Sequence, residues 1–336
     1  MLSVYGFPFL LAMLVSYILT PYIKKLAFKI GAVDRPDNRK VHKRIMPRLG
    51  GLAIYIAFMI GCVASLELTW DVCGILLGGT LIVALGVADD VYQLPAKVKL
   101  LGQIAAACVL VAFDIRIEWV NNPFGGYIYL DMLSIPWTIF WVISFTNVVN
   151  LIDGLDGLAA GVSAIASLTV ILVAIQMGYF HVAILTAALA GGIIGFIRYN
   201  FNPATIFMGD TGSMFIGYML AAISVYGAVK TAATIALIVP AIALGLPILD
   251  TAFAIMRRYA NGRPIFQPDK GHLHHRLLAQ GMSHKEAVLF MYGITAVLCI
   301  GAVLWAEMDG FYAALIIAVI MTAVAVGAKK IGILND

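Results

Sequence analysis

Long apolar runs separated by short polar segments dominate this chain. A run of about 20 apolar residues can cross the roughly 30 Å hydrocarbon core of a bilayer as a helix. Because lipid offers no partner to backbone polar groups, such runs form helices and not open strands. The pattern predicts an all-α polytopic membrane protein with about eleven transmembrane helices. The expected spans are residues 2–23, 50–67, 72–88, 99–114, 134–150, 155–177, 180–198, 212–229, 232–256, 286–306 and 310–328.

Composition supports this class and excludes a soluble domain. Of the 336 residues, 62% are hydrophobic and 12% are charged, and the mean hydropathy is +0.96. Soluble domains are about 45–50% apolar and about 25% charged. We therefore expect one integral membrane domain over residues 1–336. The first run has no basic region before it and is followed by Lys24 and Lys25, so it is expected to be a retained helix and not a cleaved leader.

The distribution of Lys and Arg predicts the orientation, because cytoplasmic loops carry an excess of both. With the N-terminus outside, all but Arg116 and Lys230 of the 22 Lys and Arg residues fall on the cytoplasmic side. An odd number of spans then places the C-terminus in the cytoplasm. The same bias already explains the basic loops, so their charge is no argument for an anionic substrate. No nucleic-acid partner is expected.

The longest outside loop spans about residues 115–133 and carries two adjacent glycines, Gly125 and Gly126, between aromatic residues. Glycine pairs of this kind favour a tight turn between two short strands. We therefore expect a small hairpin at the outer membrane surface.

Five polar segments rich in chemistry all fall on the predicted cytoplasmic side. This placement follows from hydropathy and from the Lys and Arg bias alone, and it indicates a single site. The segments are PDNRKVHKRIMPRLGG (36–51), ADDVYQLPAKVKLLGQ (88–103), TNVVNLIDGLDGLA (146–159), RYNFNPATIFMGDTGS (198–213) and RRYANGRPIFQPDKGHLHHRLL (257–278).

Asp89 and Asp90 come where the third span leaves the membrane. The helix dipole disfavours negative charge at a helix C-terminus, so a cation is expected opposite this pair. A metal ion or the nearby Lys97 and Lys99 would supply it. An ordinary polar helix end is the alternative interpretation of either carboxylate.

Asn147, Asn150 and Asp153 recur at steps of three, which puts them on one helical face. Asp156 follows three residues later. Amide and carboxylate oxygens suit Mg²⁺, which usually takes one or two protein ligands together with substrate phosphates. A capped turn between two helices remains the structural alternative.

Asp210 sits on a glycine-flanked turn that opens the eighth span, where it suits either metal binding or capping of the helix. Phe207, just before it, suits stacking on a base or anchoring at the membrane interface.

The segment GHLHHRL gathers three histidines and an arginine into five residues, His272, His274, His275 and Arg276. Zinc needs about four ligands in a defined geometry, and no cysteine accompanies this cluster. A phosphate-binding loop is favoured over a zinc site and over a solvated basic loop.

Asp250 lies inside the ninth span. An intramembrane carboxylate is a functional hypothesis by default. An ion pair with Arg257 or Arg258, about two helical turns away, is slightly favoured here.

Taken in order, the motifs ADD, NLIDGLDGL, MGDTGS and HLHH resemble the polyprenyl-phosphate N-acetylhexosamine-1-phosphate transferases, of the glycosyltransferase family 4 type. The resemblance covers essentially the whole chain. The family joins a UDP-sugar to a membrane polyprenyl phosphate, releases UMP and depends on Mg²⁺. Mn²⁺ is the alternative ion.

The resemblance implies a role for each matched residue. The implied catalytic residues are Asp89, Asp90, Lys99 and Asp153. The implied metal ligands are Asn150 and Asp210. His42 falls in the family's first basic loop. Lys97 is the alternate to Lys99 as the lysine that faces the phosphate. Asp156 and Phe207 belong to the nucleoside region. The implied substrate-binding residues are Lys43, Arg44, Arg48, Lys97, Asp156, Phe207, His272, His274, His275 and Arg276.

The subfamily is also suggested. HLHH resembles enzymes that transfer GlcNAc-1-phosphate to undecaprenyl phosphate to initiate teichoic acid, O-antigen or related polymers. Enzymes that use UDP-MurNAc-pentapeptide usually show an HHH run, and a Thr-Pro-Thr-Met-Gly-Gly segment where this chain has Met46 to Gly51. The expected partners are UDP-GlcNAc, undecaprenyl phosphate and membrane lipid, with room for a homodimer. The muramyl transferase is the alternative.

The chemistry favours direct attack by the lipid phosphate. A phosphate monoester has a second pKa near about 6 and hardly needs a strong base, while phosphoryl transfer depends mainly on positioning and charge stabilisation. A covalent carboxylate intermediate is the second mechanism. A transporter is the alternative of a different class, but transporters keep their sites near the bilayer midplane and these carboxylates gather at one face.

Overall fold

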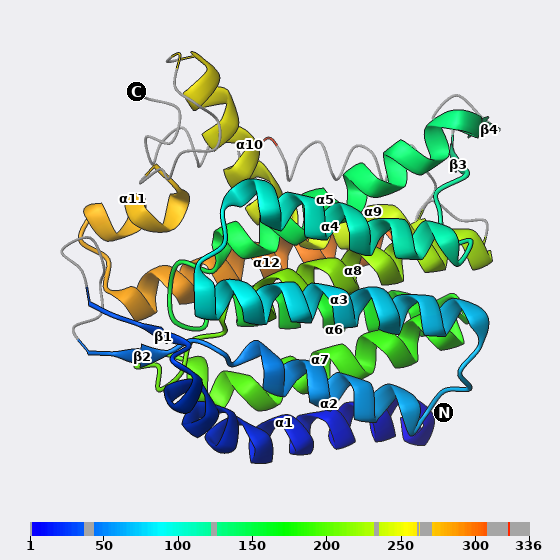
Figure 1. Ribbon diagram of the computed structural model, residues 1–336. Helices are drawn as coiled ribbons and strands as arrows, with labels where there is room; N and C mark the ends of the chain where they lie inside the picture. The colour runs from blue at the N-terminus through cyan, green and yellow to red at the C-terminus, as the bar shows by residue number, and fades with distance from the viewer. Residues whose placement is uncertain are drawn as a thin grey trace.

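The computed structural model describes residues 2–36, 44–121, 126–231, 235–260, 262, 271–307 and 322. Helices dominate this part of the chain, and they run side by side as one bundle (Figure 1). The helices and strands are α1 (Leu2–Ile30), β1 (Val33–Asp34), β2 (Met46–Pro47), α2 (Gly51–Val63), α3 (Trp70–Tyr92), α4 (Ala96–Ala112), β3 (Trp119–Asn121), β4 (Tyr127–Tyr129), the 3₁₀ helix η1 (Asp131–Leu133), α5 (Ser134–Ile152), α6 (Leu158–Gln176), α7 (Phe180–Asn200), α8 (Gly209–Thr231), α9 (Ile235–Ala243), α10 (Gly245–Ala260), α11 (Leu273–Ala279) and α12 (His284–Glu307).

Within these residues, seven helices are long and apolar enough to cross a membrane, and an eighth span results if α9 and α10 are counted as one. The chain is thus an all-α polytopic membrane protein, as expected. Helices form at the predicted spans 50–67 and 99–114, but α2 has 13 residues and α4 has 17. At 1.5 Å per residue, α2 covers only about 20 Å. The predicted span 310–328 lies outside the described residues except for residue 322.

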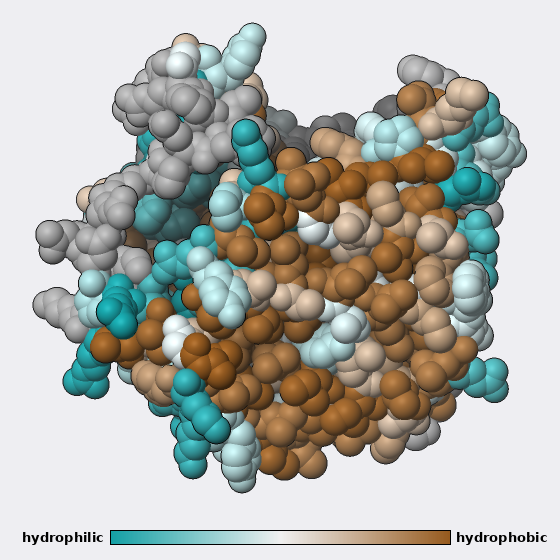
Figure 2. Space-filling view, in the orientation of Figure 1, coloured by the Kyte–Doolittle hydropathy of each residue, from teal (hydrophilic) through white to brown (hydrophobic). Residues whose placement is uncertain are grey.

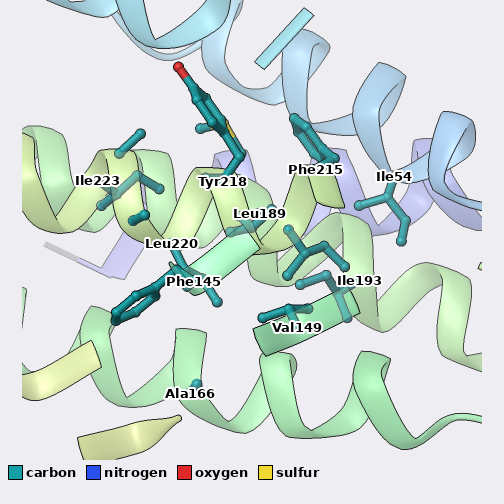
Figure 3. Close-up of a cluster of buried hydrophobic side chains, with 14 of the residues drawn as sticks. Ile54, Phe145, Val149, Ala166, Leu189, Ile193, Phe215, Tyr218, Leu220 and Ile223 are labelled. Carbon is teal, nitrogen blue, oxygen red and sulfur yellow. The ribbon is translucent and has the colours of Figure 1, made fainter. Parts of the chain in front are cut away.

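α8 forms the centre of the bundle. Of its most apolar window, 94% is buried, against 28% for α1 at the periphery. Phe145 and Val149 of α5, and Leu189 and Ile193 of α7, lie close to Phe215 and the following apolar residues of α8 (Figure 3). A helix surrounded in this way holds its first turn in a fixed place, which matters because that turn carries Asp210.

The outward surface is apolar over the helices, and hydrophilic residues gather toward the two ends (Figure 2). One end carries the antiparallel pair β1–β2 and α11, and the opposite end carries the antiparallel hairpin β3–β4 (Figure 1). The hairpin expected within residues 115–133 is therefore confirmed. The polar ends and apolar flanks are what a bilayer requires of a spanning bundle.

The predicted span 232–256 is broken. α9 and α10 meet at an angle of 73°, so α10 leaves the direction of the bundle (Figure 1). Pro247 stands in the first turn of α10, a position where proline is tolerated because its missing N–H would have no helical acceptor. The break points α10 toward α11 and the histidine segment.

Candidate active site

The C-terminal end of α3 and the first turn of α8 are joined through Asp90. Its buried carboxylate accepts hydrogen bonds from the backbone N–H groups of Asp210 and Thr211, both at 3.0 Å, and from the Thr211 hydroxyl at 2.6 Å. The first N–H groups of a helix lack intrahelical acceptors, and a carboxylate there is also favoured by the helix dipole. Asp90 therefore caps α8 from a neighbouring helix and fixes the position of Asp210.

Two cationic side chains form ion pairs with the three carboxylates. Lys99 Nζ lies 3.2 Å from Asp89 Oδ2 and 2.8 Å from Asp210 Oδ2. Arg48 contacts Asp90 Oδ1 at 2.9 Å and Asp210 Oδ1 at 3.4 Å. The cation expected opposite the acidic pair is thus Lys99 for Asp89 and Arg48 for Asp90. Asp210 is the carboxylate that both cations share.

Arg48 is brought to this cluster by the strand pair and the glycines that follow it. The backbone N–H of Gly51 donates to Met208 O at 2.8 Å. A Cβ on Gly51 would lie 2.0 Å from Gly212 Cα of α8, so only glycine permits this approach. The sequence Leu49-Gly50-Gly51 therefore lets α2 begin directly against the first turn of α8, next to Asp210.

A cavity of about 430 Å³ opens beside the carboxylate cluster. This volume lies within the range of roughly 300–1,000 Å³ that is typical of small-molecule sites. Its lining residues belong to elements that meet at the end of the bundle carrying β1–β2 and α11 in Figure 1. Its lining residues are Asp34, Arg48, Asp153, Gly154, Leu155, Asp156, Asn200, Asn202, Phe207, Gly209, Asp210, His275 and His284.

The turn between α5 and α6, residues 153–157, forms one wall. Asp156 Oδ2 accepts hydrogen bonds from Asn202 Nδ2 and from the Ala204 N–H, both at 3.0 Å. The Asp156 N–H donates to His284 Nε2 at 2.9 Å. Contacts from the α7–α8 loop and from α12 therefore hold this turn in place.

Asp153 is the first residue of this turn and also lines the cavity. Burial, together with the negative charge of Asp210 and Asp90, raises the pKa of Asp153 to about 8. Its carboxyl group is therefore protonated most of the time near neutral pH. A group of this kind in a cavity suits proton exchange with a ligand.

The three histidines of the HLHH segment have different positions. His272 Nδ1 lies 2.8 Å from Asp250 Oδ2, and Asp250 Oδ1 accepts from the Leu273 N–H at 2.8 Å. The hydrogen bonds described for Asp250 thus go to the start of α11. The sequence had favoured Arg257 or Arg258 as the partner of Asp250. His274 is buried against Gly154. Only His275 lines the cavity.

The donor chemistry of the two residues that the resemblance implies as ligands suits Mg²⁺, but of the two only Asp210 lines the cavity. Asp210 offers carboxylate oxygens there, and the Asn150 amide donates to Ser213 Oγ at 2.8 Å, which leaves its carbonyl oxygen as an acceptor. In the described part of the chain, no three His, Cys, Asp or Glu side chains are grouped to hold a metal. Two oxygen ligands completed by substrate phosphates are the usual arrangement for Mg²⁺.

The structure separates several residues that the sequence placed together. Lys97 is exposed in the first turn of α4, and Arg44 is exposed before β2; neither lines the cavity. Arg276 donates to Gly271 O at 3.2 Å. Lys43 and His42 lie outside the described residues.

Four polar lining residues were not singled out in the sequence: Asp34, Asn200, Asn202 and His284. Both asparagines fall inside the segment 198–213. Their signal was the polar amide side chain at a helix end, close in sequence to the glycine-flanked Asp210. Asp34 and His284 belong to no motif, so only the fold brings them to the cavity.

Comparison with known proteins identifies the family. The model of "Glycosyl transferase family 4" matches residues 72–228, which include Asp89, Asp90 and Asp210. The chain is 41% identical over 330 residues to the "Probable undecaprenyl-phosphate N-acetylglucosaminyl 1-phosphate transferase" of Bacillus subtilis (strain 168), covering 98% of this chain and 92% of that protein. The chain belongs to glycosyl transferase family 4. The resemblance carried by the sequence motifs is confirmed.

Two further relatives show the range of this similarity. The "Decaprenyl-phosphate N-acetylglucosaminephosphotransferase" of Mycolicibacterium smegmatis is 38% identical over 325 residues, with 87% of this chain and 80% of that protein covered. The "Phospho-N-acetylmuramoyl-pentapeptide-transferase" of Thermoanaerobacter sp. (strain X514) is 32% identical over 311 residues, with 86% and 93% covered. Similarity thus extends over most of the chain in both groups.

Proposed function

We propose that the chain transfers GlcNAc-1-phosphate from UDP-GlcNAc to undecaprenyl phosphate and releases UMP, as the first membrane step of a cell-envelope polysaccharide. The observation that carries this proposal is the cluster of Asp89, Lys99 and Asp210 at the helix ends, beside a nucleotide-sized cavity. The similarity to N-acetylglucosaminyl 1-phosphate transferases, at 41% and 38% identity, supports GlcNAc over the muramyl sugar, whose transferase is 32% identical.

The donor lies along the cavity, with its nucleoside at the Asp156 turn and Phe207 and its diphosphate toward Asp210. The acceptor phosphate approaches from the membrane interface beside Asp89 and Lys99. Each pair of like unit charges at 4 Å costs about 4 kcal/mol at an effective dielectric constant of about 20. Lys99 and Arg48 offset this repulsion, because both already face the shared carboxylate. Asp210 and Asn150 would hold Mg²⁺, which supplies further positive charge when bound.

The lipid phosphate attacks the sugar-bearing phosphorus directly in this mechanism. Asp90 positions Asp210 and Thr211, since both of its oxygens already accept hydrogen bonds. Asp89 holds Lys99 and accepts from the Leu94 N–H at 2.8 Å. Asp153, which is protonated most of the time near neutral pH, exchanges a proton with the bound phosphates.

The topology belongs to the same proposal. We infer that eleven spans, with the N-terminus outside and the C-terminus inside, place the cavity on the cytoplasmic side. UDP-sugars are cytoplasmic donors, and the acceptor keeps its polyprenyl tail in the hydrocarbon. A site at the inner ends of the helices reaches both substrates.

Purified protein tests the substrate assignment. With Mg²⁺, undecaprenyl phosphate and UDP-GlcNAc, UMP release is expected, and it should stop when either the lipid or the metal is withheld. UDP-MurNAc-pentapeptide serves as the control donor and should give no turnover. Robust turnover with the muramyl donor would establish the alternative substrate, and lipid-independent transport of UDP-GlcNAc without UMP release would establish a transporter.

The mechanism has its own test. A covalent carboxylate intermediate would release one UMP per site from enzyme, UDP-GlcNAc and Mg²⁺ without lipid. Direct attack predicts no such burst. A stoichiometric burst that disappears in Asp89→Asn would identify Asp89 as a nucleophile and overturn the direct mechanism while leaving the substrate assignment intact.

A further inference from the structure

His284 opens α12 and lines the cavity, although no sequence motif includes it. Its Nε2 lies 2.9 Å from the backbone nitrogen of Asp156, which donates the hydrogen. A backbone N–H has no acceptor capacity, so Nε2 must carry the lone pair. A neutral imidazole bears one hydrogen, and that hydrogen is therefore on Nδ1.

This tautomer leaves His284 with an N–H donor in a polar cavity. Among the described residues, no protein acceptor for Nδ1 is found. A donor fixed in direction by a bond on the other side of its ring is a preorganised ligand contact, because little freedom is lost when the ligand arrives. Nε2 of the ring thus binds the protein, and the Nδ1–H can donate to a ligand.

The position of His284 indicates which part of the ligand it meets. The residue is bonded to the Asp156 turn, which is held by Asn202 and Ala204. Asp210 also lines the cavity and carries the ion pairs to Arg48 and Lys99. Diphosphate and metal belong with these cations, so the Asp156 turn is left for the nucleoside.

We propose that His284 donates its Nδ1–H to an acceptor oxygen on the nucleoside of the donor substrate. The proposal rests on the proposed function, because it assumes a uridine nucleotide in this cavity. It adds a binding residue outside the motifs and assigns it a defined tautomer. His284 then has two tasks, since the same ring that contacts the nucleoside also fixes the Asp156 turn.

Tyr292 allows the two tasks to be separated. It lies on the same helix, and its hydroxyl donates to Gly157 O of the same turn, but it does not line the cavity. Tyr292→Phe removes one bond that holds the turn and no bond to a ligand. His284→Ala removes one bond of each kind.

The test is the affinity of purified protein for UMP and for UDP-GlcNAc, measured by calorimetry. His284→Ala is expected to weaken both by the same factor, about three- to tenfold, the size of one neutral hydrogen bond. The KM for UDP-GlcNAc should rise equally, while the KM for undecaprenyl phosphate stays within about twofold. Tyr292→Phe, and Lys285→Ala on the exposed side of α12, should change UMP affinity by less than about twofold. The thermal midpoint of each variant checks that it is folded.

Three outcomes would overturn the proposal. Unchanged UMP affinity in folded His284→Ala would show that the ring makes no nucleoside contact. A loss confined to UDP-GlcNAc would move the contact to the sugar or its phosphate. An equal loss in Tyr292→Phe would show that His284 acts only by holding the turn. In each case wild-type protein still binds UMP and transfers sugar phosphate, whereas failure of the proposed function would remove both from the wild type.

Discussion

Asp210 is the residue on which the charges of the site converge, because its two oxygens face different cations. Lys99 lies 2.8 Å from one oxygen and Arg48 lies 3.4 Å from the other. The sequence singled out Asp210 through its flanking glycines and named Lys99 with Lys97 as its alternate. Residues two apart on a helix point to different sides, so the spacing alone could not decide between them. The structure distinguishes the two lysines, since Lys97 is exposed and Lys99 contacts Asp89 and Asp210.

Replacing each lysine with methionine tests this difference. Lys99→Met leaves Asp89 and Asp210 without their shared cation, and transfer should fall by about a hundredfold or more, in the range known for a lost electrostatic contact at a transition state. Lys97→Met changes an exposed side chain, and transfer should stay within about threefold. Initial rates of UMP release at saturating substrates measure both. Comparable losses in the two variants would contradict the placement of Lys99.

His274 shows what a sequence motif hides. Burial, with the charges of neighbouring histidines, lowers the pKa of His274 to about 3, although the usual value is about 6.5. The unfolded chain therefore binds a proton near pH 5 that the folded chain does not bind. Stability from this residue is present above about pH 6.5 and is lost as the pH falls toward 3, because protonation favours the unfolded chain.

Lowering the pH from 7.5 to 5.0 should therefore reduce the free energy of unfolding by about 2 kcal/mol through this one group. In His274→Gln the same change of pH should cost correspondingly less. Thermal midpoints in detergent at the two pH values, compared between wild type and variant, isolate the contribution from other titrating groups. An identical pH dependence in both proteins would mean that His274 is not buried as a neutral ring.

At the scale of elements, the site is made by helix ends that meet. Hydropathy predicts the helices well, because burial in lipid demands an uninterrupted apolar surface. It does not predict their directions: the run 232–256 is continuous in hydropathy, yet α9 and α10 meet at 73°. Asp250 of α10 binds the start of α11. That contact joins segments 22 residues apart, and the sequence gives no sign of it.

The histidine segment at α11 also packs tightly against the α5–α6 turn, through His274 and Gly154. A Cβ on Gly154 would lie 2.5 Å from His274 Nε2, so Gly154→Ala should displace the turn or the histidine segment. Displacements near 1 Å in an active site cost up to about a hundredfold, and we expect transfer to fall at least about tenfold. Gly293→Ala on α12 is the matched control, because nothing lies within 4 Å of its Cβ. Full activity in Gly154→Ala would show that this contact is free to relax.

At the scale of the whole molecule, the cavity and the hairpin β3–β4 lie at opposite ends of the bundle (Figure 1). The sequence could predict this separation, because Lys and Arg bias and hydropathy assign each loop to a side before any contact is known. It could not predict the cavity itself, whose walls combine β1, Arg48 after β2, the α5–α6 turn, the α7–α8 loop with the helix ends that flank it, α11 and α12. Walls drawn from six separate parts of the chain exist only once the bundle has packed.

The orientation of the bundle can be measured by labelling single cysteines in intact cells. The background lacks the native cysteines Cys62, Cys73, Cys108 and Cys299. Met132, which is 93% exposed beside the hairpin, and Tyr92, which is 76% exposed at the other end of the bundle, each accept a cysteine without loss of a packed side chain. If the cavity faces the cytoplasm, a membrane-impermeant maleimide should label Met132→Cys in intact cells and Tyr92→Cys only after permeabilisation. Labelling in the reverse order would place the cavity outside, where no UDP-sugar is available, so the same result would also contradict the proposed donor.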